Sequence, residues 1–381
     1  MSESFSIVGF SSLSALGHRK KNIYQSYKKN DHNLTKIDGI WQGKIPSESW
    51  EEIKKIKQEF PYRHLDKTTL YALFVSRQAK GMANLSKEDS LGVNIGSSRG
   101  PTESIEAHHR DFLTSNVTHI RTSPITTAGN IASWVGHDLE AQGPNISHSI
   151  TCSSSFHSIL NGIVWLKSGF VNHFLVGGTE APLTPFTFGQ MKALKIYSNL
   201  KKGFPCRSMD LAKKENTMVL GEGAGAACLT AGKKENALCH IIGWGYGTEA
   251  LSNGVSIQKD GVSLQKSMTG ALSSHDPSSV DAIIMHAPGT MKGDLAEMKA
   301  INKVFPNEAP FCTSNKWKVG HSLGASGMLS LELALFMLDE NILHKTPYVN
   351  QSYKSREIKR ILINTVGFGG NAASLLLEKA Q

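Results

Sequence analysis

Apolar and polar residues follow two spacings along this chain, and the two spacings alternate. Short apolar runs between turn-forming residues predict strands, at residues 6–10, 91–95, 174–176, 280–285, 360–365 and 373–377. Longer stretches with apolar residues three and four positions apart predict helices, at residues 20–28, 65–82, 125–139, 262–272 and 324–338. Strands that alternate with helices favour an α/β fold in which helices layer against a sheet.

Two of the predicted strands, at residues 5–10 and 239–245, resemble each other. Both are apolar, and both reach a glycine followed by an aromatic residue, where we expect the strand to end in a turn. The resemblance predicts an internal duplication with a period far longer than that of a solenoid repeat. Residues 1–238 and 239–381 are therefore expected to form two βα-rich halves with no linker between them.

The stretch 149–157 carries the first candidate for chemistry, Cys152. A helix is predicted directly behind it, with one apolar stripe made by Phe156, Ile159, Leu160, Ile163 and Val164. The hydroxyls of residues 153–155 are expected to serve free N–H groups in its first turn. Cys152 would then lie at the positive end of the helix dipole, which favours a nucleophilic thiolate. A buried structural cysteine is the alternative.

Two histidine motifs lie in the second half. His286 follows an apolar strand and precedes Ala-Pro-Gly-Thr, while His321 lies in a glycine-rich turn that leads into a helix. A thiol with two histidines is suited to acyl transfer, because one atom attacks and two N–H groups stabilise an oxyanion or enolate. A single loop histidine is more often only a solvated residue. We expect no metal site, because neither histidine has a third ligand at helical or loop spacing.

Charge and cysteine content narrow the possible partners. The 381 residues carry a formal net charge of +9, without a nucleic-acid-binding motif, so an acidic protein is the first candidate partner. The five cysteines show no CxxC spacing and are expected to be reduced thiols of a cytoplasmic protein. No segment resembles a signal peptide or a membrane span, so neither membrane insertion nor nucleic-acid binding is expected.

Together these motifs resemble the β-ketoacyl-acyl-carrier-protein synthases, the elongating ketosynthases of fatty-acid and type II polyketide systems. The resemblance covers nearly the whole chain. It rests on Thr151-Cys152-Ser153-Ser154-Ser155, on Gly221-Glu222-Gly223-Ala224-Gly225, on the two histidine motifs and on Gly367-Phe368-Gly369-Gly370-Asn371. It implies the thiolase-like fold, in which duplicated halves form a layered αβαβα core. It also implies an acyltransferase that performs a decarboxylative Claisen condensation with malonyl-acyl-carrier protein.

The same resemblance implies roles for individual residues. Cys152 would carry the acyl group, and His286 and His321 would support malonyl decarboxylation. Lys316 matches the family's active-site lysine, and Glu297 the carboxylate that ties the network together. The N–H groups of Cys152 and Phe368 would form the oxyanion hole, with Phe368 as a gate. The expected substrate and pantetheine contacts are Thr290, Gly367, Gly369 and Arg99. No cofactor is expected to be bound, since substrates arrive on the phosphopantetheine of the carrier protein.

The resemblance further implies protein partners. An acidic acyl-carrier protein is expected to dock on Arg63, Lys67 and Arg207. The chain is also expected to form a two-fold dimer, either with itself or with a homologue that resembles a chain-length factor. Arg99 falls where an acyl pocket is expected. It should either pair locally, with Glu103 or Glu106, or face an aromatic or polyene acyl chain.

Several positions depart from the family pattern. Ile150-Thr151 stands where Thr-Ala is usual, Pro288 replaces a threonine, and residues 214–218 lack the Arg-Asp-Gly-Phe pattern. Residues 30–59 are polar and rich in lysine and are expected to form surface loops and a short helix. This region looks shorter than the corresponding region of the family. These departures favour a specialised synthase of a pigment, aryl-polyene or other secondary-metabolite pathway.

Other functions fit fewer residues. A weakly active or regulatory chain-length partner would share the fold but typically lacks the cysteine. A degradative thiolase would need a second active-site cysteine, for which Cys312 matches no motif. An initiating synthase would carry asparagine in place of His321. A binding module would leave three motifs unexplained.

Overall fold

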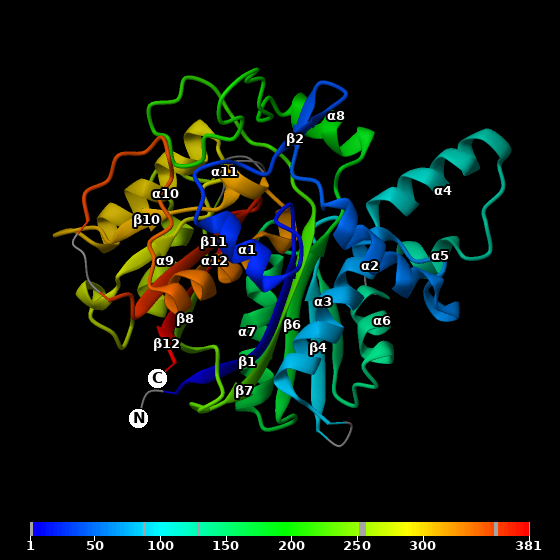
Figure 1. The fold of residues 1–381 in the computed structure, drawn as a ribbon, viewed down its shortest axis with the longest axis horizontal. Coiled ribbons are helices and arrows are strands. Elements are labelled where there is room, and N and C mark those ends of the chain that lie inside the picture. Colours follow the sequence, from blue (N-terminus) through cyan, green and yellow to red (C-terminus); the bar gives the residue numbers. More distant parts are fainter. Residues whose placement is uncertain (1–2, 87–88, 128–129, 251–256, 354–356, 381) are drawn as a thin grey trace.

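The computed structural model describes residues 3–86, 89–127, 130–250, 257–353 and 357–380, and its centre is one ten-stranded mixed sheet (Figure 1). The strand order is β10-β9-β11-β12-β8-β1-β7-β6-β4-β5. The strands are β1 (Phe5–Leu13), β4 (Leu91–Gly96), β5 (Asn145–His148), β6 (His173–Glu180), β7 (Gly223–Ala231), β8 (Cys239–Thr248), β9 (Ala282–Ile284), β10 (Phe311–Thr313), β11 (Arg360–Gly367) and β12 (Asn371–Lys379). A separate hairpin joins β2 (Thr35–Ile37) to β3 (Ile40–Gln42).

The sheet consists of two halves with the same strand order. From its outer edge, the first half runs β5-β4-β6-β7-β1 and the second runs β10-β9-β11-β12-β8. β1 and β8 pair antiparallel where the halves meet. The five sheet strands of the first half all precede β8, which begins at Cys239. The predicted duplication is therefore present in the topology.

Helices form three layers around these two half-sheets. The helices are α1 (Lys20–Tyr27), α2 (Ser47–Gln58), α3 (Lys67–Ala83), α4 (Thr102–Ser115), α5 (Thr122–Thr126), α6 (Asn130–Asp138), α7 (Ser154–Lys167), α8 (Pro185–Ala193), α9 (Val262–Ala271), α10 (Met291–Val304), α11 (Lys316–Val319) and α12 (Ser326–Glu340). α7 and α12 pack together between the half-sheets, with α3 and α6 outside one half and α9 and α10 outside the other. Every residue of α12 from Ser326 to Leu338 is buried, as a central helix requires. The predicted αβαβα layering is confirmed.

The expected turns at the glycine–aromatic pairs are wrong, because both strands continue through them. β1 extends to Leu13 and β8 extends to Thr248. A Cβ on Gly9 would lie 2.2 Å from the Ala79 carbonyl oxygen of α3, and one on Gly243 would lie 2.0 Å from the Ala271 carbonyl oxygen of α9. These glycines are therefore close-packing positions, at which an outer helix touches its strand.

Three local predictions need correction. Residues 30–59 contain the hairpin β2–β3 and the twelve-residue helix α2, whose Ile53 and Ile56 are buried. The predicted helix 125–139 is instead α5 followed by α6, and part of the predicted span lies outside the described residues. In α7 the buried face includes Leu166, whereas Val164 is 62% exposed. No helix among the described residues is long and apolar enough to cross a bilayer.

Candidate active site

Cys152 lies in a tight turn between β5 and α7. Thr151 has a φ of +48°, and the N–H groups of Ser153 and Ser154 donate to the carbonyls of Ile150 and Thr151. The Ser154 hydroxyl accepts from the Ile150 N–H at 2.9 Å and donates to the Thr151 carbonyl at 2.6 Å. The expected capping of the first-turn N–H groups by these hydroxyls is wrong, because the hydroxyl of Ser154 braces the turn that presents Cys152.

His321 approaches Cys152 from the end of α11. Its Nε2 lies 3.2 Å from Cys152 Sγ. Gly320 precedes it with a φ of +81°, a conformation that favours glycine. The His321 N–H donates to the Val219 carbonyl at 2.7 Å, and its carbonyl accepts from the Gly221 N–H at 3.0 Å. The first residue of the Gly221–Gly225 motif therefore helps to hold the backbone of His321 in place.

His286 lies just beyond the end of β9 and faces His321. The ring centroids of the two histidines are 5.1 Å apart, with an interplanar angle of 85°. Both Glu297 oxygens accept backbone N–H groups, one from His286 and one from Ala287, each at 2.8 Å. Asn364 of β11 donates to the same carboxylate at 3.2 Å. Glu297 therefore fixes the backbone of the His286 loop, and burial raises its pKa to about 7.

Burial governs the protonation states of these groups. It raises the pKa of the Cys152 thiol to about 12, with Glu180 adding to the rise while Lys316 opposes it. A helix N-terminus offers too little charge to offset such burial. The expected resting thiolate is therefore wrong. Burial, with the Lys316 charge, also holds the pKa of His286 and His321 well below 6.5, so His321 is neutral and can accept the thiol proton.

Lys316 is buried at the base of this cluster. Burial lowers its pKa to about 8, and Glu297 is the strongest group acting in the opposite direction. Its Nζ has no hydrogen-bond partner among the described residues. Because the ammonium lowers the pKa of both histidines, its contribution here is electrostatic.

Cys152 is a possible third metal ligand beside the two histidines, although it lies at neither helical nor loop spacing from them in the sequence. Cys152 Sγ and the ring nitrogens of His286 and His321 all lie within 4.8 Å of one another. Zn²⁺ takes thiolate and imidazole ligands. In this arrangement, however, the thiol pKa is raised and a buried ammonium lies nearby, so a divalent cation would meet a neutral donor and a like charge. The set is better suited to proton transfer.

The three groups open onto a cavity of about 320 Å³. Of the predicted contacts, Thr290, Gly367 and Phe368 line it, while Gly369 and Arg99 are not among its lining residues. The Thr290 hydroxyl also caps α10 by accepting from the Gly293 N–H at 3.2 Å. Sequence reasoning missed the remaining wall, which is formed by Met191, Leu194, Ile196, Asn216, Met218, Ile257, Pro288, Met291, Lys292, Gly293, Leu323 and Val366. Of these residues, Asn216 and Met218 in the atypical segment 214–218, and Pro288, stand out in the sequence as departures from the family pattern.

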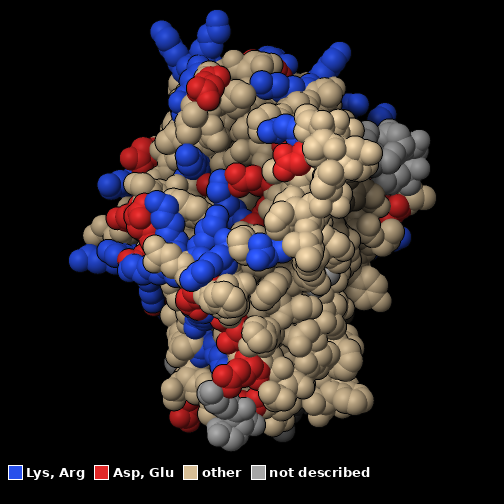
Figure 2. All heavy atoms as spheres, turned by 90° about the vertical axis from the view of Figure 1, so that its right-hand side faces the viewer, with Lys and Arg blue, Asp and Glu red and all other residues tan. Residues whose placement is uncertain are grey.

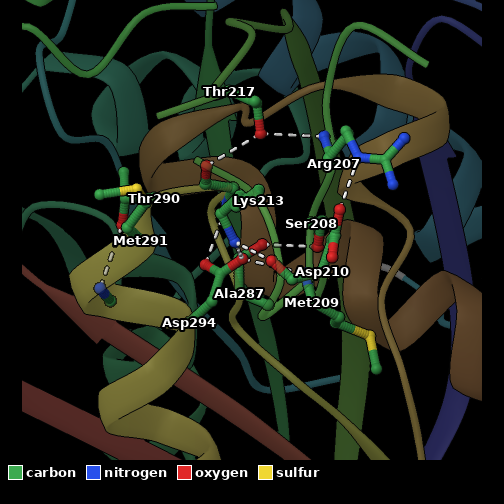
Figure 3. Close-up of polar contacts among 12 residues, drawn as sticks. Arg207, Ser208, Met209, Asp210, Lys213, Thr217, Ala287, Thr290, Met291 and Asp294 are labelled. Atoms are coloured by element: carbon green, nitrogen blue, oxygen red, sulfur yellow. Dashed lines mark hydrogen bonds and ion pairs between the residues drawn. The ribbon is translucent and has the colours of Figure 1, made fainter. Parts of the chain in front are cut away.

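A buried ion pair fastens the loop after His286 to the segment before β7 (Figure 3). Lys213 Nζ lies 2.7 Å from Asp294 Oδ2, and their side chains are 2% and 0% exposed. The carboxylate also accepts the N–H groups of Met209 and Gly289. Thr217 extends the link, because its hydroxyl donates to the Gly289 carbonyl at 3.0 Å. The atypical segment is thus a support of the His286 loop.

Arg99 pairs with neither expected carboxylate. Its guanidinium instead donates to Gln190 of α8, while its backbone N–H donates to the buried Glu180 at 3.2 Å. Glu103 pairs with Lys67, and Glu106 accepts from Thr184. Sequence reasoning missed Glu180, whose pKa burial raises to about 7. The sequence feature that could have identified Glu180 is its place as an acidic residue at the end of an apolar, glycine-rich strand.

The three basic docking candidates differ in their contacts. Lys67 forms an ion pair in which its Nζ lies 3.0 Å from Glu103 Oε2. Arg207 lies 2.6 Å from Asp210 and stacks over the Tyr348 ring at 4.7 Å. Arg63 is exposed, lies over Phe60, and has no ion pair among the described residues. Arg63 is therefore the candidate whose charge is most available.

The chain matches known proteins over most of its length. Residues 6–235 match the sequence model of the β-ketoacyl synthase N-terminal domain, and residues 238–350 match that of the C-terminal domain. The 3-oxoacyl-acyl-carrier-protein synthase 2 of Staphylococcus aureus (strain COL) is 26% identical over 410 residues, which cover 98% of this chain and 98% of that protein. The synthase 2 of Coxiella burnetii is 26% identical over 409 residues, with the same coverage of both chains.

Solved ketosynthases share the fold at low sequence identity. The ishigamide ketosynthase/chain length factor has a TM-score of 0.89 at 18% identity and covers 100% of both chains. AntDE:AntF, an acyl-carrier protein in complex with its ketosynthase, has a TM-score of 0.87 at 18% identity and covers 100% of both chains. The ketosynthase ApeO of Xenorhabdus doucetiae, in complex with its chain length factor ApeC, has a TM-score of 0.82 at 20% identity and covers 99% of this chain and 98% of that chain.

Proposed function

The chain belongs to the β-ketoacyl synthase family of condensing acyltransferases, and we propose that Cys152 is the residue that carries its acyl group. The observation that carries this proposal is the 3.2 Å contact between Cys152 Sγ and the Nε2 of neutral His321. In the first half-reaction His321 takes the thiol proton while sulfur attacks the acyl thioester. The carrier's pantetheine thiol then leaves with that proton.

The second half-reaction uses the same pocket. Malonyl-carrier protein loses its carboxylate as CO₂, and the electron pair of the broken bond forms an enolate that N–H groups of His286 and His321 stabilise. The enolate carbon attacks the acyl carbonyl on Cys152, a C–C bond forms, and the C–S bond breaks. The sulfur leaves with the electron pair of that bond and takes up one proton from solvent, which restores the Cys152 thiol. The N–H groups of Cys152 and Phe368 would hold the intermediate oxyanion. No resident cofactor takes part, because both substrates arrive as thioesters of phosphopantetheine, near Thr290 and Gly367.

An acidic acyl-carrier protein is the proposed donor and acceptor. The net charge of +9 favours an acidic partner, and Arg63, Lys67 and Arg207 are the proposed contacts. Reversing the charges of Arg63 and Lys67 together should raise the KM for the carrier. Normal kinetics of that variant at low ionic strength would exclude this docking surface.

We propose a two-fold dimer, with a second copy or with a chain-length-factor-like homologue. Figure 2 shows, on the face that carries α4 and α5, a broad region without charged side chains beside a margin in which Lys and Arg are mixed with Asp and Glu. Large apolar side chains are exposed on α4 and after it, namely Ile105, Phe112, Leu113, Val117 and Ile120. β5 is the last strand of the sheet and, among the described strands, has a neighbour on one side only. Native mass spectrometry, alone and with candidate homologues, tests this assembly.

The proposed pathway is specialised, and builds a polyketide or polyene chain in the reducing cytoplasm. The polar contacts of Arg99 and the atypical segment 214–218 support the specialised pathway. The named ishigamide, AntF and ApeO structures point the same way. The five cysteines are free thiols, which fits a reducing compartment. The alternative is a weakly active chain-length partner of another synthase, but a cysteine paired with a histidine argues against it.

The deciding experiment is peptide mass spectrometry of the protein after incubation with acyl-carrier proteins that bear saturated, aromatic and polyene groups. We expect the acyl group on Cys152 alone. Cys152→Ala should lose it, whereas Cys312→Ala, a matched change of another buried thiol, should retain it. Acylation elsewhere, or condensation by Cys152→Ala, would overturn the assignment. No acylation by any carrier would favour the chain-length partner.

A further inference from the structure

Thr151 has a backbone conformation that its side chain disfavours. Its φ of +48° lies in the left-handed region, where a β-branched residue is a genuine outlier. Such strain persists only where the surroundings hold it, and it concentrates at functional sites. The hydrogen bonds of the Thr151 carbonyl and of the Thr151 hydroxyl are the contacts that hold this conformation.

The carbonyl of Thr151 fixes one N–H of the proposed oxyanion hole. It accepts from the Ser154 N–H at 3.2 Å and from the Ser154 hydroxyl at 2.6 Å. This carbonyl and the Cys152 N–H belong to one planar peptide group. Holding the carbonyl therefore sets the direction of the Cys152 N–H.

The hydroxyl of Thr151 reaches the loop that carries the second N–H. It donates to the Phe368 carbonyl at 3.1 Å. The approach depends on Gly367, because a Cβ there would lie 1.8 Å from Thr151 Oγ1 and 3.0 Å from the Cys152 nitrogen. Gly369 and Gly370 follow with φ values of +93° and +69°, so the loop turns sharply beyond Phe368. Phe368 itself lines the Cys152 cavity and is 39% exposed.

We propose that Thr151 is a positioning residue, whose hydroxyl latches the Phe368 loop over Cys152. The latch keeps both N–H donors aligned and limits access to the cavity while Cys152 carries the acyl group. This inference rests on the proposed function. Without the latch the loop opens more often, and water can attack the acyl thioester, which releases a carboxylic acid and the free Cys152 thiol.

Thr151→Val is the test variant, because valine keeps the β-branch but cannot donate a hydrogen bond. Release of acid from acyl-Cys152, measured without the malonyl substrate, should rise about three- to tenfold, as expected for the loss of one neutral hydrogen bond. Thr151→Ser keeps the hydroxyl and should remain near the parent rate. Thr230→Val, which removes a hydroxyl in β7 that donates to the Asn172 carbonyl at 3.3 Å, should leave the rate unchanged.

A second measurement needs no acyl chemistry. The rate at which iodoacetamide alkylates Cys152 should rise in Thr151→Val by a similar factor, while the melting temperatures of Thr151→Val and Thr151→Ser stay close. Equal alkylation of parent and Thr151→Val, or equal effects of serine and valine, would overturn the latch. If the parent is not acylated at Cys152, the proposed function fails, and alkylation still decides the latch.

Discussion

Lys213→Met breaks the buried ion pair that supports the His286 loop. Lys213 Nζ and Asp294 Oδ2 are 2.7 Å apart, and both side chains are almost fully buried. At that distance two unit charges attract by roughly 6 kcal/mol at an effective dielectric constant of 20. Most of this attraction offsets the cost of burying the charges. Removal of one partner typically destabilises a fold by about 3–5 kcal/mol. We expect a loss of about 3 kcal/mol here, because Met209 and Gly289 still donate to the carboxylate.

The loss of stability in Lys213→Met should depend on pH. Burial raises the pKa of Asp294 above 3.8, and Lys213 acts in the opposite direction, so its removal raises this pKa further. A carboxyl whose folded pKa exceeds its unfolded pKa disfavours the fold once it ionises, so the penalty is largest at neutral pH. The difference in stability between parent and Lys213→Met should therefore narrow as the pH falls through the folded pKa.

Calorimetric melting temperatures from pH 7.5 down to 5 would measure this dependence. The double variant Lys213→Met/Asp294→Asn removes both charges and should recover much of the lost stability. Lys233→Met breaks the partly exposed pair with Glu378 and should cost less than about 1 kcal/mol. Equal losses in Lys213→Met and Lys233→Met, or a difference that does not narrow in acid, would refute a supporting role for the buried pair.

The acylation rate of Cys152 should change by far less than tenfold per pH unit between about pH 7 and 8.5, because the thiol passes its proton directly to neutral His321 and only the electrostatic effect of Lys316, whose pKa is about 8, varies there. A tenfold rise per pH unit would instead identify a free thiolate as the attacking species. Arg99→Ile should leave the ratio of kcat/KM for saturated and polyene acyl carriers unchanged, because the guanidinium donates to Gln190 and Arg99 does not line the Cys152 cavity; a shift toward saturated carriers of about threefold or more, the scale of a lost cation–π contact, would instead place Arg99 against the acyl chain. Arg63→Glu should raise the KM for an acidic carrier roughly fivefold at low salt, and Arg207→Glu by less, since its charge is already paired; equal changes would contradict this reading of the surface.

Periodicity predicted the alternation of strands and helices, whereas the αβαβα layering came from the family resemblance. The helices α3, α9 and α12 lie within two residues of their predicted positions, and the duplicated strands β1 and β8 begin where predicted but run three residues further. The helix α2 was only partly anticipated, because lysines and glutamates surround its buried Ile53 and Ile56. The glycine–aromatic pairs were misread, since close helix packing and a turn both select glycine.

The sequence predicted which residues form the catalytic cluster, but not their protonation states or their hydrogen-bond partners. The chemistry of a thiol with two histidines, together with the family resemblance, grouped Cys152, His286 and His321, whose ligand atoms the fold brings within 4.8 Å of one another. The partner of Arg99 could not be read locally, because Gln190 is 91 positions away. The thiol pKa depends on how completely the fold buries the sulfur, which no local pattern records.

Burial also explains why strained backbone collects around this site. A charged nucleophile would bring its own reactivity, but here burial keeps both the Cys152 thiol and His321 neutral, so transfer depends on their distance and alignment. The chain holds Thr151 at a φ of +48° before the thiol and Ala287 at +24° after His286, and it needs the left-handed Gly320 before His321. The conformations of Thr151 and Ala287 oppose local preference and persist because buried or backbone hydrogen bonds hold them, whereas glycine adopts a positive φ at position 320 without strain. A chain that relaxed these turns would gain local stability and lose the 3.2 Å contact on which the proposed chemistry rests.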